Sequence, residues 1–162
     1  MTSADQQQSS SSFSGHFEAE IGGGRWAPSS QSNYSLSEFA YKLAEYEREL
    51  EIKDETDQKR SKKAARKFTV TTRYAPVSKE TYSFTEDLPF NLTRPIGSFD
   101  KEEVFRVVVD VSGSKRSWKE KWTGGSGGSR NATIRRQFTD QGLTVTYESG
   151  KGVYIKEFKR KT

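Results

Sequence analysis

The sequence of 162 residues contains no cysteine and only one histidine, His16. The absence of cysteine excludes disulfide bonds and thiolate metal sites. A single histidine leaves few of the nucleophile–base pairs and histidine-based metal sites on which enzymes depend. We therefore predict a protein that is not an enzyme and that needs no cofactor or metal ion.

Hydrophobic residues are also scarce, at 31% of the chain, where globular domains have about 45–50% when glycine is counted. No apolar run is long enough to span a membrane, and the N-terminus lacks the pattern of a signal peptide. These absences predict a cytoplasmic protein, with a nuclear location as a further possibility. Residues 1–23, rich in Ser, Gln and Gly, are expected to be a disordered N-terminal tail, and residues 24–162 a single domain.

One segment has helical periodicity. Ser35 and Glu38 form a capping box before apolar residues at helical spacing, Leu36, Phe39, Ala40, Leu43, Tyr46 and Leu50. The charged stretch that follows contains no Gly or Pro, so we expect one helix over about 35–66. This stretch ends in KRSKKAARK, residues 59–67, which is either a solvated helix end or a patch for anionic partners.

From Phe68 onward the chain alternates as strands do, and short strands at regular spacing predict an antiparallel barrel or sandwich. Trp118, Glu120 and Trp122 share one face of their strand. The last three strands place Arg136 and Lys156 on inner faces among apolar and aromatic side chains. A buried cation is costly without a partner. Either an anionic ligand or Glu120 could be that partner, and the residues alone leave both open.

Several stretches resemble the intracellular lipid-binding family, the fatty-acid-binding and retinoid-binding proteins. These are Gly24-Arg-Trp26 with SQSNYSLSEFAYKL, FTVTTRY with SKETYSF, VVVDVSGSKRSWKEKWTG, and ATIRRQFTDQGLTVTY with GVYIKEFKRK. The resemblance implies a mainly β fold, an up-and-down calycin-like barrel with a helical lid, that carries one fatty acid or related amphiphile. In that family an inward Arg and an Arg-x-Tyr pair bind the ligand carboxylate. By position these become Arg136, and Lys156 with Phe158.

Within this resemblance, Trp118, Phe158 and Tyr154 would line the cavity, with Glu120 beside Arg136. The protein would be a monomer that contacts anionic membranes transiently through its basic segment. Two alternatives remain. A nucleic-acid-binding module would carry its cations and aromatic residues on an outer face. A ligand-free barrel that serves as a scaffold for protein interaction would be filled by its own side chains.

Overall fold

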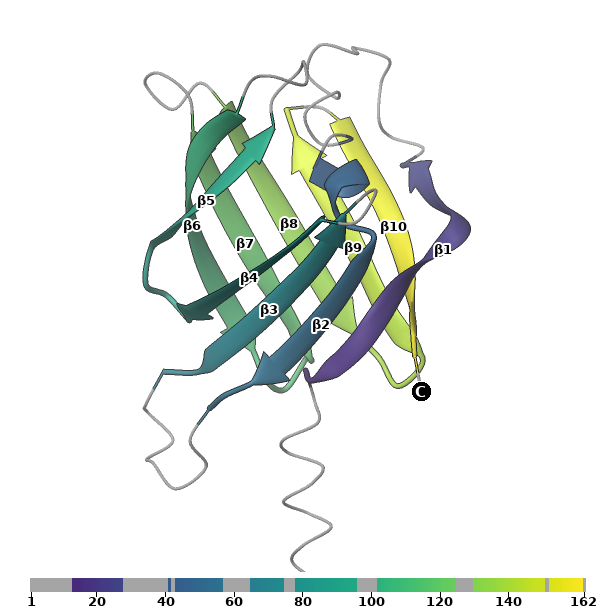
Figure 1. Ribbon diagram of the computed structural model, residues 1–162, viewed down its shortest axis with the longest axis horizontal. Helices are drawn as coiled ribbons and strands as arrows, with labels where there is room; N and C mark the ends of the chain where they lie inside the picture. Colours follow the sequence, from purple (N-terminus) through teal and green to yellow (C-terminus); the bar gives the residue numbers. More distant parts are fainter. Residues whose placement is uncertain are drawn as a thin grey trace, which may run out of the picture.

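The computed structural model describes residues 13–27, 41, 43–56, 65–74, 78–95, 102–124, 130–150 and 152–161. Ten antiparallel strands form one sheet in the order β4-β3-β2-β1-β10-β9-β8-β7-β6-β5, which curls into a nearly closed barrel (Figure 1). Every neighbour in this order except β1–β10 is consecutive in the chain, as in an up-and-down barrel. The predicted fold class is confirmed. No helix of the described residues is long and apolar enough to cross a membrane.

The strands have the following bounds: β1 Gly15–Trp26, β2 Glu49–Asp54, β3 Lys67–Tyr74, β4 Ser78–Thr85, β5 Phe90–Pro95, β6 Glu102–Ser112, β7 Ser117–Gly124, β8 Arg130–Phe138, β9 Gly142–Ser149 and β10 Gly152–Arg160. Helical turns are described at Tyr41 and at Leu43–Tyr46, immediately before β2. In Figure 1 this short helix lies at one end of the barrel.

Two predictions made from the sequence are wrong. The segment Glu49–Asp54 is strand β2 and not a continuation of the helix, because Leu50 and Ile52 alternate with charged residues and point into the core. The N-terminal tail is also shorter than predicted. Residues 15–26 form β1, and both Phe13 and Phe17 are fully buried. The helical turns at Tyr41 and Leu43–Tyr46 lie within the predicted helix, residues 55–56 and 65–66 are not helical, and most of the rest of the predicted helix and tail lies outside the described residues.

Aromatic rings fill one end of the barrel. Phe13, Phe68, Trp118 and Phe138 contact one another, with ring centroids 5.0 to 5.8 Å apart. Offset and edge-to-face pairs at this spacing each add about 0.5–1.5 kcal/mol beyond the area they bury. This cluster closes one end of the barrel and leaves the polar residues of the interior between it and the short helix.

The barrel is not closed by backbone hydrogen bonds between β4 and β5, which are the two ends of the strand order. Side chains join these strands instead. Phe84 of β4 stacks on Phe90 of β5 with ring centroids 5.3 Å apart. Further along, Arg94 Nη1 lies 2.9 Å from Glu80 Oε1. We call this junction the β4–β5 seam.

Candidate functional site

Arg136 is the centre of a buried polar cluster inside the barrel. Alternation along β8 turns Ala132, Ile134, Arg136 and Phe138 inward, as the sequence predicted. The Arg136 side chain is only 2% exposed. All three of its nitrogens donate hydrogen bonds: Nε to Glu120 at 2.7 Å, Nη1 to Glu47 at 2.9 Å and Nη2 to Glu47 at 2.7 Å. The cation is therefore held between two carboxylates.

Glu120 reaches this cluster from β7, the neighbouring strand. The indole nitrogens of Trp118 and Trp122, on either side of it, donate hydrogen bonds of 2.8 and 2.9 Å to its two oxygens. Trp118 lies directly opposite Arg136 in the sheet register, and Glu120 is the next residue along β7 on the same inner face. The carboxylate of Glu120 is therefore close enough to bind the guanidinium as well. The internal Glu120–Arg136 pair, one of the two alternatives left open by the sequence, is present.

Glu47 follows the last helical residue and carries the second carboxylate. The two Nη atoms of Arg136 bind it as a planar fork, and the Tyr147 hydroxyl of β9 donates a further hydrogen bond of 2.7 Å to its Oε1. Burial opposes the ionisation of this carboxyl. The charge and hydrogen bonds of Arg136 and the bond from Tyr147 outweigh burial and hold the pKa of Glu47 below its ordinary value. Glu47 is thus a buried anion.

Lys156 enters the cluster from β10 and binds the backbone at the end of the helix. Its Nζ donates to the carbonyl oxygen of Ala44 at 2.7 Å and also to that of Glu47. A cation suits this position because the last carbonyls of a helix carry partial negative charge. Burial lowers the pKa of Lys156 to about 8, although the charge of Glu47 acts in the opposite direction. The ring of Phe158 also contacts the ammonium group, with its centroid 5.3 Å from Nζ.

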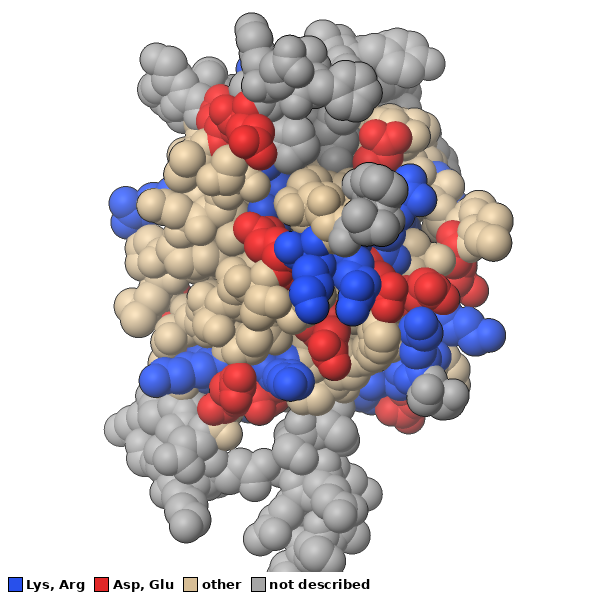
Figure 2. All heavy atoms as spheres, viewed as in Figure 1, with Lys and Arg blue, Asp and Glu red and all other residues tan. Residues whose placement is uncertain are grey.

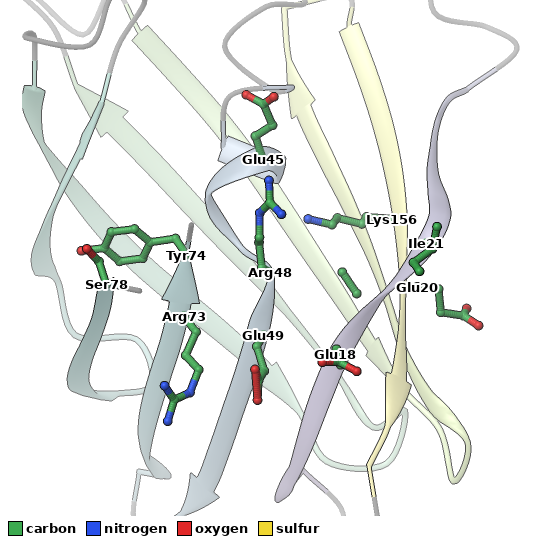
Figure 3. A pocket seen from close by; sticks show the side chains of 11 residues that line it. Glu18, Glu20, Ile21, Glu45, Arg48, Glu49, Arg73, Tyr74, Ser78 and Lys156 are labelled. Atoms are coloured by element: carbon green, nitrogen blue, oxygen red, sulfur yellow. The ribbon is translucent and has the colours of Figure 1, made fainter. Parts of the chain in front are cut away.

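A groove of about 960 Å³ runs along the barrel wall where β1 and β2 separate, and Lys156 forms part of its lining. Pairing between β1 and β2 covers only residues 15–18 of β1, Ala19 still donates to the carbonyl oxygen of Arg48, and the register of β1 with β10 is interrupted between Ala19 and Gly24. Figure 3 shows the side chain of Lys156 extending from β10 towards the end of the helix, with Arg48 and Glu45 beside it. The groove therefore leads from the surface to one edge of the polar cluster.

The structure brings together most of the residues predicted to form the site. Glu120 binds both Arg136 and Trp118, while Lys156 binds the backbone of Glu47, the other partner of Arg136, and lies over the ring of Phe158. Tyr154 does not join them. Its ring packs on those of Trp26 and Tyr41, with centroids 5.1 and 5.2 Å away. Whether these residues bind a ligand stays a prediction.

Sequence reasoning missed Glu47 and the role of Tyr147. A signal for Glu47 was available, because it lies four residues after Leu43 and three before Leu50, on the apolar stripe of the predicted helix. A carboxylate on such a stripe needs a buried cation as its partner. Tyr147 alternates with Leu143 and Val145 on the inner face of β9, and all three are buried.

The acidic and basic groups of the cluster pair with one another and do not converge on a common centre. Among the described residues, no group of three His, Asp or Glu side chains is placed to hold a metal ion. What the arrangement offers chemically is a receptor for a carboxylate, built from a guanidinium fork and a phenol hydroxyl.

The ten-stranded barrel with a short helix at its end is the calycin-type fold of the fatty-acid-binding proteins. No protein-family model matches the chain, and no curated protein matches it in sequence. The likeness is structural.

Three solved structures illustrate this likeness. Secretory abundant heat soluble protein 4 from Ramazzottius varieornatus is 15% identical with a TM-score of 0.64, over 93% of this chain and 95% of that one. Lipid binding protein 8 from Caenorhabditis elegans is 15% identical with a TM-score of 0.61, over 93% and 96%. The Schistosoma mansoni fatty acid binding protein, solved with arachidonic acid, is 17% identical with a TM-score of 0.58, over 95% and 99%.

Proposed function

We propose that the protein is a non-enzymatic carrier that binds a fatty acid or a similar hydrophobic anion inside its barrel. One observation carries this proposal: Arg136 and Tyr147 already hold a carboxylate, that of Glu47, inside the barrel. Because the receptor binds a carboxylate of the chain itself, its geometry suits the head group of a fatty acid. The solved structures of this fold that carry the names of fatty-acid-binding proteins support the same reading.

Binding would proceed by exchange of one carboxylate for another. Glu47 lies just outside the helix, so a movement of this short segment would withdraw its side chain and free the fork of Arg136. The carboxylate of the ligand would take its place, and the net charge of the interior would not change. The acyl chain would supply most of the affinity, at about 0.8 kcal/mol for each buried methylene before ordering costs.

The groove between β1 and β2 offers a route to the cluster, because it reaches Lys156 from the surface. Transient contact with anionic membranes, through the basic segment 59–67, remains part of the proposal as a way to collect the ligand. Most of that segment lies outside the described residues. We also propose that the carrier acts as a monomer.

A ligand-free scaffold is the second candidate, and a specific observation favours it. All nitrogens of Arg136 have partners within the chain, so the cluster is satisfied without any ligand. A nucleic-acid-binding module has less support. Trp118 and Phe158 are buried inside the barrel. On the face that Figure 2 shows, acidic and basic side chains are interspersed and do not form an extended basic surface.

Displacement of a fluorescent fatty acid tests the proposal, with the parent compared with an Arg136→Gln/Glu47→Gln double variant. The double variant removes one cation and one carboxylate together, so the net charge of the interior is kept. We expect saturable one-site binding to the parent that changes little with salt, and binding at least about tenfold weaker in the double variant. Glu51→Gln, an exposed site on β2, serves as the control. Absence of binding to the parent would favour the scaffold, and a steep salt dependence would favour nucleic acid.

A further inference from the structure

A second polar cluster lies inside the barrel at the β4–β5 seam, around Arg94 of β5. The Arg94 side chain is 2% exposed, and its guanidinium carbon lies 4.5 Å from the ring centroid of Tyr46 and 5.4 Å from that of Trp122. Its Nη1 donates to the carbonyl oxygen of Thr93 at 2.8 Å. Its Nη2 is buried and has no hydrogen-bond partner among the described residues. Arg94 is thus a buried cation with one unpaired donor nitrogen, whereas every nitrogen of Arg136 has a partner.

Two further side chains carry a buried polar atom without a hydrogen bond: Glu80, whose side chain is 30% exposed and paired with Arg94, and Thr72, which lies next to Glu80. Glu80 Oε1 lies 2.9 Å from Arg94 Nη1 as an ion pair, but it accepts no well-aligned hydrogen bond from the described residues. Thr72 of β3 is directly opposite Glu80 in the sheet register, and its hydroxyl is fully buried and also unpartnered within the described part of the chain. An unpaired donor of Arg94, an ion-paired oxygen of Glu80 that lacks an aligned hydrogen bond and an unpartnered hydroxyl of Thr72 therefore lie on three strands, with Glu80 adjacent to both of the others.

Buried polar atoms are almost always hydrogen-bonded in folded proteins, and each one left unpaired costs about 1–3 kcal/mol. Three of them at one place indicate a group that the described side chains do not supply. The group must accept a hydrogen bond from Arg94 and donate one to Glu80. A hydroxyl does both, whereas a carboxylate could satisfy Arg94 but would repel Glu80.

The charge balance of the interior leads to the same chemical class. Three cations, Arg94, Arg136 and Lys156, face three carboxylates, Glu47, Glu80 and Glu120. Exchange of Glu47 for the carboxylate of a ligand preserves this balance, but a further anion at Arg94 would leave one negative charge uncompensated at a buried site. A group that binds at Arg94 would therefore have to be uncharged.

We propose that Arg94, Glu80 and Thr72 form a subsite that binds a hydroxyl group on the chain of the amphiphile, so that the preferred ligand is a hydroxylated fatty acid. This inference rests on the proposed function, because it requires the ligand to lie inside the barrel. The subsite is linked to the carboxylate receptor through Trp122, which stacks near Arg94 and donates to Glu120, the partner of Arg136. The proposal places a single ligand across both positions.

The test compares stearic acid with hydroxystearic acids that carry the hydroxyl near the carboxyl end or at mid-chain. Dissociation constants are measured by titration calorimetry for the parent, Arg94→Met, Thr72→Val and, as a matched surface control, Arg106→Met on the exposed face of β6. We expect the parent to bind one of the hydroxystearic acids at least about tenfold more tightly than stearic acid. The ratio should fall towards one in Arg94→Met and Thr72→Val and persist in Arg106→Met.

The possible outcomes separate this inference from the proposed function. Binding of stearic acid with no preference for any hydroxystearic acid would overturn the inference alone and mean that the subsite holds only water. A preference that persists in both Arg94→Met and Thr72→Val would also overturn it. If no acid binds the parent, the proposed function fails and the inference fails with it. Thr72→Val removes only a hydroxyl, so the test stands even if Arg94→Met does not fold.

Discussion

Arg136 and Glu47 form a planar, two-bonded ion pair inside the barrel, with nitrogen–oxygen distances of 2.9 and 2.7 Å. The pair joins β8 to the end of the short helix, 89 residues apart in the sequence. It therefore has two consequences: it fastens the helix to the barrel wall, and it occupies the guanidinium fork of Arg136, which the proposed function assigns to the carboxylate of the ligand.

The first consequence is for stability. Glu47→Gln removes the charge but keeps the size of the side chain, and we expect it to lower the free energy of unfolding by about 2–3 kcal/mol near neutral pH. The pKa of Glu47 in the folded state is below its ordinary value of 4.5. Its contribution is therefore complete above that value and is lost as the pH falls through the folded-state pKa.

Chemical denaturation at several pH values checks this expectation. The difference between parent and Glu47→Gln should be largest near neutral pH and shrink below about pH 4.5. Glu51→Gln, whose side chain is exposed on β2, should stay close to the parent throughout. A difference for Glu47→Gln that does not depend on pH would mean that the ion pair does not carry the effect.

Lys156 makes the stability depend on pH in a second range, on the alkaline side. Its pKa is about 8 in the folded protein, against an ordinary value of 10.5. Between these values the unfolded chain binds a proton that the folded protein has released, so stability relative to Lys156→Met should rise as the pH increases from 8 to 10.5. Lys159→Met, at an exposed position of the same strand, is the matched control for the loss of a lysine. If the difference in free energy of unfolding between the parent and Lys156→Met does not change with pH, the lysine is not desolvated.

The β4–β5 seam is held by side chains, so we expect Phe90 to matter more than its partial burial suggests. Phe90→Ala removes the ring that stacks on both Phe84 and Tyr82. It should lower the free energy of unfolding by about 2 kcal/mol, less than for a fully buried phenylalanine. It should also speed amide hydrogen exchange in β4 and β5 before other strands.

The exposed neighbour Leu88 provides the comparison for the seam. Leu88 is 58% exposed, so Leu88→Ala should change stability by no more than about 0.5 kcal/mol. Equal effects of Phe90→Ala and Leu88→Ala, or exchange that quickens evenly across all strands, would contradict a seam closed by aromatic contacts.

The sequence predicted the strands in which apolar and polar residues alternate clearly. It missed β2, in which most residues are charged. In β7 and β8 the inward positions hold Trp118, Glu120, Ile134 and Arg136, and the prediction of their faces is confirmed. In β2 only Leu50 and Ile52 are apolar, and the surrounding charges were read as a solvated helix. The alternation in β2 extends over only six residues, so the longer helical pattern before it led to the prediction of a continuous helix.

The burial of Phe13 could not be predicted from local pattern, and the stripe that marks Glu47 as buried does not identify the cation that it pairs with. Phe13 stands in a serine-rich stretch, and only the aromatic cluster contributed by distant strands makes its burial favourable. Arg136 was predicted to need a partner, and Glu120 was one of those considered. Glu47 was not, because two residues 89 positions apart meet only through the curvature of the barrel.

The measurement that tests the account most directly is the affinity of Glu47→Gln for a fatty acid. If Glu47 occupies the carboxylate receptor, its neutral replacement competes less well, and the variant should bind a fluorescent fatty acid at least about tenfold more tightly than the parent although it is less stable. The Glu51→Gln control should bind as the parent does. Equal or weaker binding by Glu47→Gln would contradict the claim that Arg136 and Tyr147 form the carboxylate site of a lipid carrier.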